Sequence, residues 1–260
     1  MQQPIGIFDS GIGGTSIWKE IAKLLPNEET IYLADSKNAP YGNKSSEAIL
    51  ALSIKNTELL LELGAKIIVV ACNTATTNAI ATLRARYQVP FIGIEPAIKP
   101  AALQTRTNTV GVLATKGTLT SALFHNTSKL HAAGIKVIEQ EGKGLVKLIE
   151  SGEAQSKEME VLLRDLVQPM VDQGIDCLVL GCTHYPYLIP VLKKVLPANV
   201  QIIDSGFAVA KQTKAVLKES NLLNTVARNK VRHTFYTNTD VALLRQLVET
   251  DTSYIYFKEF

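Results

Sequence analysis

Cysteine is scarce in this sequence of 260 residues, which contains only three. Such a small, odd number argues against a disulfide framework and leaves buried or reactive thiols as the alternatives. Apolar runs are short as well: none approaches the roughly 18 residues that span a bilayer, so we expect no membrane association. The chain also enters an apolar segment almost at its start, without a basic-then-apolar leader, and we expect a cytoplasmic protein.

An excess of charge of one sign is also missing. The formal net charge is +3, from 27 Lys and Arg against 24 Asp and Glu. Because the basic residues form no cluster, we expect no nucleic-acid partner. The composition is otherwise ordinary for a globular protein, and the length suits one large α/β domain or two smaller ones.

Short apolar segments alternate with helical patterns along the chain. This alternation predicts parallel sheets with right-handed crossovers. The predicted strands are 5–8, 30–34, 67–71, 90–94, 109–114, 135–139, 177–180 and 200–204. The predicted helices are 15–25, 45–63, 76–87, a stretch from about 118 to 133, 144–150, 157–173, 187–196 and 207–219.

Two strand-end motifs occur twice. A strand followed by Asp-Ser-Gly occurs at Asp9 and Asp204, and a strand followed by Cys and polar residues occurs at Cys72 and Cys182. We interpret these pairs as a weak internal duplication. The sequence therefore predicts an α/β fold of two similar parallel-sheet domains with the active site in the cleft between them. The first domain is expected to comprise 1–97 plus about 208–260, and the second 98–207.

Cys72 and Cys182 each follow directly on an apolar strand. Because ligands bind beyond the carboxyl ends of parallel strands, we hypothesise that the two thiols face each other across one small substrate. A helix that begins directly after each cysteine would favour the reactive thiolate. A zinc site formed by these cysteines and His184 is a weaker alternative, because no tight Cys-x-x-Cys or His-x-x-x-His spacing is present, and we expect no metal. Cys177, inside an apolar run, is predicted to be a core residue.

Asp9 opens the glycine-rich loop 9–14. A dinucleotide fingerprint would require glycine at Ser16, and an acidic residue before the loop would repel a pyrophosphate, so no nucleotide cofactor is expected. The loop N–H groups at a helix N-terminus could instead bind a small anion such as a carboxylate. Asp9 would then be free to bind an ammonium group or orient a thiol. The structural alternative is a helix-capping aspartate.

Other polar side chains also follow strand ends. His184 could hold or receive a proton beside Cys182, or could be a packed core histidine. Several hydroxyl and amide side chains near strand ends could bind the carboxylates of a substrate. The threonines among them could equally cap helices. The residues are Tyr41, Asn43, Asn73, Thr74, Thr115, Thr118 and Thr183. Glu150 ends an apolar helical stretch, and composition alone indicates a solvated surface glutamate.

Seven motifs together closely resemble the glutamate racemase family. They occur in the family's order over most of residues 5–206: IGIFDSGIGG (5–14), APYGNKS (39–45), VVACNTAT (69–76), GIEPAIKPA (93–101), GVLATKGT (111–118), LGCTHYPYL (180–188) and IDSG (203–206). Aspartate racemases share the two cysteines but match APYG-x-K-S and GCTHYP less well. One segment departs from the pattern: GKGLV at 142–146 stands where many members carry Cys-Pro-x-Phe-Val. The tail after about residue 208 has no match.

The resemblance implies interconversion of L- and D-glutamate without a cofactor, in which Cys72 deprotonates D-glutamate and Cys182 deprotonates L-glutamate. Asp9 and His184 are the implied helpers of the thiols, and Glu150 is a candidate further site residue. The implied substrate-binding residues are Asp9, Ser10, Pro40, Tyr41, Gly42, Asn73, Thr74, Thr115, Thr118, Thr183 and His184. The resemblance also implies a supply of D-glutamate for peptidoglycan, and a homodimer.

Three alternatives stay open at this point. The first is a racemase for aspartate or another small acidic amino acid. The second is a cis–trans isomerase of the same superfamily that uses one cysteine covalently. The third is a glutamate-binding or regulatory protein whose thiols are incidental to its role.

Overall fold

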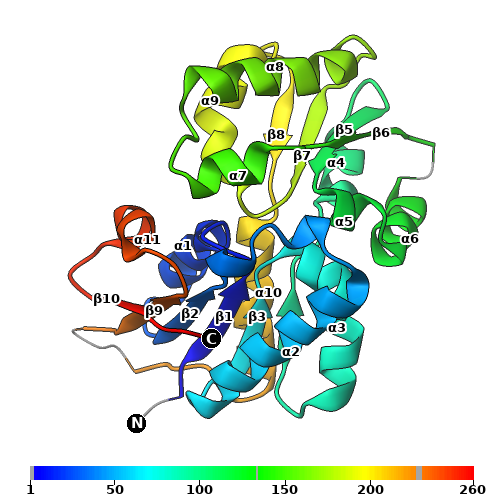
Figure 1. The fold of residues 1–260 in the computed structure, drawn as a ribbon. Coiled ribbons are helices and arrows are strands. Elements are labelled where there is room, and N and C mark those ends of the chain that lie inside the picture. Colours follow the sequence, from blue (N-terminus) through cyan, green and yellow to red (C-terminus); the bar gives the residue numbers. More distant parts are fainter. Residues whose placement is uncertain (1–2, 133, 227–229) are drawn as a thin grey trace.

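The computed structural model describes residues 3–132, 134–226 and 230–260. Two lobes are visible in Figure 1, each built around its own β-sheet with helices packed against it. Every strand pairing among the described residues is parallel. The predicted fold class of two parallel-sheet α/β domains is therefore confirmed.

The larger sheet has six strands in the order β10-β9-β2-β1-β3-β4. Its strands are β1 (Ile5–Asp9), β2 (Thr30–Ala34), β3 (Ile67–Val70), β4 (Phe91–Gly93), β9 (His233–Thr237) and β10 (Ser253–Phe257). The smaller sheet has four strands in the order β6-β5-β7-β8. Its strands are β5 (Thr109–Ala114), β6 (Lys136–Glu141), β7 (Cys177–Gly181) and β8 (Gln201–Ile203). Strands β1, β3, β5 and β7 are buried along their whole length, which explains their uninterrupted apolar sequences.

Helices connect the strands. They are α1 (Thr15–Leu24), α2 (Ser46–Glu62), α3 (Asn73–Arg86), α4 (Ile98–Gln104), α5 (Lys116–Leu119), α6 (Ala122–His131), α7 (Leu145–Glu150), α8 (Lys157–Val171), α9 (Ile189–Val195), α10 (Gly206–Glu219) and α11 (Val241–Val248). The described residues also contain short 3-10 turns, which are η1 (Ser36–Asn38), η2 (Tyr41–Asn43) and η3 (Tyr185–Leu188). Helix α2 begins as predicted, because the Ser45 hydroxyl accepts a hydrogen bond from the Ala48 N–H. Within the described residues no helix has both the length and the apolarity needed to cross a membrane.

Several predicted helices differ from the observed ones. The stretch predicted from about 118 to 133 is two helices, because Ser121 caps a new helix by accepting from the Phe124 N–H; residue 133 itself lies outside the described residues. The helix predicted over 187–196 begins as the 3-10 turn η3. Helix α3 begins at Asn73, directly after the cysteine at the end of β3 and earlier than predicted.

The C-terminal part of the chain returns to the larger sheet. Strand β9 pairs with β2, β10 pairs with β9, and α10 packs against α1. A buried ion pair fixes this return: Lys66 Nζ lies 2.6 Å from Glu28 Oε2 and also donates to the Leu222 carbonyl oxygen. In Figure 1 the larger sheet and its helices form the lower lobe, and strands β5–β8 lie in the upper one.

Candidate active site

A small cavity of about 250 Å³ is lined by residues from both lobes. It is lined by Ser10, Pro40, Tyr41, Gly42, Cys72, Asn73, Thr74, Thr115, Val146, Cys182, Thr183 and His184. All of these except Val146 are site residues expected from the sequence. Cys72 follows β3 of the larger sheet and Cys182 follows β7 of the smaller one, so the two thiols open into one cavity from opposite lobes.

Cys72 occupies the N-cap position of α3. Its sulfur accepts a hydrogen bond from the Ala75 N–H at 3.4 Å, and the thiol donates to Ser10 Oγ at 3.6 Å. Burial raises the pKa of the Cys72 thiol well above its ordinary value, and the nearby Asp9 charge adds to this effect. The N–H at the helix start lowers the pKa of Cys72, in the direction expected from the sequence, but desolvation outweighs it and the net shift favours the thiol.

Cys182 faces an imidazole that is itself paired with a carboxylate. His184 Nδ1 lies 3.8 Å from Cys182 Sγ, and its Nε2 lies 2.5 Å from Glu150 Oε1. Burial lowers the pKa of His184, but hydrogen bonds to Cys182 and Glu150, together with their charges, outweigh burial and raise the pKa well above its usual value. An imidazolium in this position can donate a hydrogen bond to a thiolate and stabilise it.

Glu150 is part of this site, and its interpretation as a solvated surface residue is wrong. Helix α7 ends at Glu150 and places its carboxylate against the glycine loop, where it accepts from the Ile12 N–H at 2.7 Å and from Ser36 Oγ at 2.9 Å. A Cβ added at Gly11 would lie 2.0 Å from Glu150 Oε1, so a glycine is required for this approach. Nothing in the local pattern indicates these contacts, because all of the partners are distant in sequence.

Asp9 lies behind the cavity wall and is fully buried. Its Oδ2 accepts from the N–H groups of Gly11 and Gly14 at 3.1 and 3.0 Å, and its Oδ1 accepts from Thr183 Oγ1 at 3.1 Å. The loop N–H groups thus bind protein carboxylates, and the expectation that they form a free anion site is wrong. Burial raises the pKa of Asp9 to about 6, although the His184 charge and the Gly14 N–H oppose the rise.

Three threonine hydroxyls connect the two lobes beside the cavity. Thr74 Oγ1 lies 2.8 Å from Thr115 Oγ1 and 3.3 Å from Thr118 Oγ1, and the last two are 3.1 Å apart. Thr74 belongs to α3 of the lower lobe, whereas the other two follow β5 of the upper lobe. Thr118 therefore supports the threonines that line the cavity but is not part of its lining.

Asn73 and Tyr41 both line the cavity, but they differ in whether their polar groups have hydrogen-bond partners. The Asn73 amide is buried, and neither its oxygen nor its nitrogen has a hydrogen-bond partner among the described residues. Such a group is costly unless a ligand satisfies it. The Tyr41 hydroxyl, in contrast, donates to Asp35 Oδ2 at 2.5 Å and accepts from Asn56 Nδ2 at 3.0 Å. Tyr41 therefore lines the cavity while its polar group is already paired.

The remaining sequence candidates lie outside this cavity. Asn43 lines a neighbouring cavity instead. Cys177 is buried in the apolar cluster of the smaller sheet, as predicted. The zinc alternative would require ligands gathered around one ion, and no group of three or more His, Cys, Asp or Glu side chains is so arranged within the part of the chain that the structure describes.

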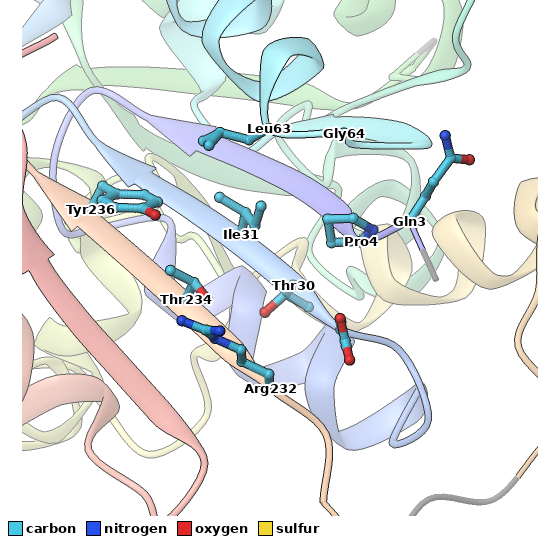
Figure 2. Close-up of a pocket in the computed structure, with 10 residues that line it drawn as sticks. Gln3, Pro4, Thr30, Ile31, Leu63, Gly64, Arg232, Thr234 and Tyr236 are labelled. Atoms are coloured by element: carbon cyan, nitrogen blue, oxygen red, sulfur yellow. The ribbon is translucent and has the colours of Figure 1, made fainter. Parts of the chain in front are cut away.

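A separate cavity of about 880 Å³ lies at the opposite end of the larger sheet (Figure 2). Pro4, Thr30 and Arg232 mark the points where β1, β2 and β9 begin, and all three line it. Ligands of open α/β sheets bind beyond the carboxyl ends of the strands, and the described residues that line this cavity include neither a thiol nor an imidazole. The cavity with both cysteines is therefore the candidate active site.

Comparison with known proteins identifies the family. The chain is 49% identical to glutamate racemase from Ectopseudomonas mendocina, over 89% of each chain. Glutamate racemase RacE1 from Bacillus anthracis has the same fold, with a TM-score of 0.86 and 29% identity over 99% of this chain and 97% of the other. The enzyme from Francisella tularensis, solved in complex with D-glutamate, gives a TM-score of 0.85 and 29% identity over 99% and 98%. The resemblance seen in the motifs is thus confirmed. The Asp/Glu/hydantoin racemase profile matches residues 5–213, and the chain belongs to that family.

Proposed function

We propose that this protein interconverts L- and D-glutamate by a two-base mechanism. The observation that carries the proposal is the convergence of Cys72 and Cys182 on one cavity from strand ends in different lobes. A single base could remove and return a proton on only one face of Cα. Two thiols approaching from opposite lobes provide a base on one face and an acid on the other.

The reaction balances with protein groups alone. One thiolate takes the α-proton and becomes a thiol, the electron pair stays on the substrate as a carbanion, and the opposite thiol gives its proton to the other face of Cα. Hydrogen bonds from the Asn73 amide and the Thr74 hydroxyl would stabilise the charge that develops on the α-carboxylate. The small cavity leaves little room for water beside a bound substrate, which would strengthen these contacts.

The protonation states favour L-glutamate as the substrate of the resting form. Cys72 is held as a thiol, whereas Cys182 lies beside an imidazolium. In this form Cys182 can remove the proton of L-glutamate while Cys72 supplies one to the other face. The D-to-L direction runs with the roles exchanged, so Cys72 deprotonates D-glutamate. Glu150 and Asp9 act through other groups, and we assign them as positioning residues.

Glutamate is favoured over aspartate because relatives that are 49% and 29% identical to this chain are glutamate racemases, one of them solved with D-glutamate. We infer that the reaction supplies D-glutamate for peptidoglycan. We also propose a cytoplasmic homodimer; light scattering and cell fractionation test these two points. We propose that the first domain comprises 1–97 with about 208–260 and the second comprises 98–207. The pairing of β9 with β2 supports the assignment of the C-terminal segment to the first domain.

The direct test is incubation of the pure protein with L-glutamate in D₂O without added cofactor. Loss of optical rotation, with deuterium arriving at Cα, is the expected result. Binding of glutamate without turnover would instead favour a binding protein, and turnover of aspartate alone would favour the aspartate racemase alternative. Turnover of a substrate with a double bond, but of neither amino acid, would favour a cis–trans isomerase.

A further inference from the structure

A second cavity adjoins the proposed active site. It has a volume of about 1040 Å³ and shares Pro40, Gly42, Thr115 and Val146 with the cavity that holds the two thiols. These shared residues form a common wall, so the larger cavity lies directly beside the catalytic one. We call it the vestibule; its other lining residues are Ala39, Asn43, Lys116, Glu141, Gly142, Lys143, Gly144 and Lys147.

The charged side chains of the vestibule are mostly basic. Lys116 opens α5, Lys143 lies in the loop between β6 and α7, and Lys147 lies on α7. All three are exposed, and none forms an ion pair with an acidic side chain within the described residues. Glu141 is the single acid among the described lining residues, so these side chains give the vestibule a net positive charge.

The loop that carries Lys143 is held in place on both sides. The Gly142 N–H donates to the Ala114 carbonyl oxygen at 2.9 Å, and Tyr185 Oη donates to the Gly142 carbonyl oxygen at 3.3 Å. A Cβ at Gly142 would lie 2.1 Å from that Tyr185 oxygen, and Gly144 has a φ of +86°. Both positions therefore favour glycine, and the backbone between them places Lys143 in the lining of the vestibule.

We propose that the vestibule is the substrate entrance and that Lys116, Lys143 and Lys147 concentrate anionic amino acids there. This inference rests on the proposed function. Glutamate has two carboxylates and one ammonium group, so it carries one net negative charge at neutral pH. A basic cleft with low-dielectric walls raises the local concentration of such an anion, and the effect decreases when salt shortens the range of the field. This electrostatic attraction acts on substrate capture, so we expect it to change KM and not kcat.

The test compares charge-reversal variants in kinetic assays at low and high salt. K143E/K147E should raise the KM for L- and D-glutamate about 3- to 10-fold at low ionic strength, with kcat within about twofold of the wild type. The difference should shrink severalfold at ~0.5 M salt. K129E/K136E is the matched control, because both lysines are exposed on the same lobe and line neither cavity. It should leave KM unchanged.

Two outcomes separate this inference from the proposed function. If the wild type racemises glutamate but K143E/K147E matches the control in KM and salt dependence, the inference is wrong and the proposed function stands. If the wild type does not racemise glutamate, the proposed function fails, and calorimetric binding of D-glutamate to the same variants tests the vestibule instead. A thermal melt checks folding; should K143E/K147E unfold, K143A/K147A carries the same test with a smaller expected change.

Discussion

His184 Nε2 lies 2.5 Å from Glu150 Oε1, and the other nitrogen of the same ring faces Cys182 at 3.8 Å. This geometry allows the carboxylate to orient the imidazole, and the contact raises the pKa of His184, which favours the charged form of the ring beside the thiol. This contact joins the end of α7 to the loop after β7. The side chain of Glu150 is 15% exposed and that of His184 only 1%, so the pair is largely shielded from solvent.

Replacement of Glu150 by Gln should therefore alter the pH dependence of the reaction. Because Glu150 helps to raise the pKa of His184, its neutralisation lets the imidazolium lose its proton at a lower pH. We expect kcat/KM to fall about 10- to 100-fold and the basic limb of its pH profile to move to lower pH.

Ser36→Ala is the matched control for this variant. It removes one hydrogen bond to Glu150 but keeps the carboxylate charge, so its pH profile should stay close to that of the wild type. An E150Q enzyme with reduced activity and an unshifted profile would show that Glu150 is merely structural.

Asp9→Asn should stabilise the protein at neutral pH while it reduces activity. The pKa of Asp9 rises from 3.8 to about 6 on folding, so the folded state holds its proton more tightly than the unfolded chain does. The stability that this proton contributes is complete below pH 3.8 and is lost as the pH rises through 6. Above pH 6 the ionised group costs about 3 kcal/mol, a cost that asparagine avoids.

Chemical denaturation of both proteins at pH 4, 5, 6 and 8 measures this difference. The free energy of unfolding of D9N should exceed that of the wild type by an amount that grows between pH 4 and 6 and is then constant. A difference that does not depend on pH would show that Asp9 is ionised as readily in the folded protein as in the unfolded chain.

Asn73→Leu should separate stability from substrate binding. The buried Asn73 amide has no hydrogen-bond partner among the described residues, so its replacement by an apolar side chain of similar size breaks no observed bond. We expect an unchanged or higher Tm together with at least a tenfold loss of kcat/KM. Asn56→Leu is the comparison, because it removes the hydrogen bond to Tyr41 and should lower Tm. Full activity of N73L would remove Asn73 from the substrate contacts.

Lys66→Met should destabilise the whole protein without a direct effect on the site. The Lys66–Glu28 pair is buried, and removal of one partner leaves an uncompensated charge, which costs about 3–5 kcal/mol. The double variant K66M/E28L should recover part of this loss, although the contacts of Glu28 with Asn224 are lost as well. Urea unfolding measures both variants. A K66M protein as stable as the wild type would mean that the ion pair adds nothing to the attachment of the C-terminal segment.

The two thiols could be predicted from sequence because their environment is local. An apolar run before Cys72 and another before Cys182 indicate buried parallel strands, and the geometry of parallel sheets places the residues after them at the ligand edge. Strands β1, β3, β5 and β7 were predictable for the same reason. In contrast, β9 contains several polar residues and β10 several exposed ones, and their pairing with a sheet built more than a hundred residues earlier leaves no local signal.

The contacts that tune the site were beyond sequence reasoning. Glu150 meets His184 only after α7 and the loop following β7 come together in space. Burial of Cys72, which raises its pKa against the effect of the helix, arises only when the chain is folded. The pairing of Tyr41 with Asp35, which turns the hydroxyl to a protein partner, likewise follows from tertiary structure.

The most direct test of the two-base mechanism is the racemisation rate of single cysteine variants. Cys72→Ala and Cys182→Ala should each abolish turnover of L- and D-glutamate, while Cys177→Ala, which changes a core residue outside the cavity, should retain it. Circular dichroism of each variant checks that it is folded. Near-normal turnover by either C72A or C182A would contradict the account.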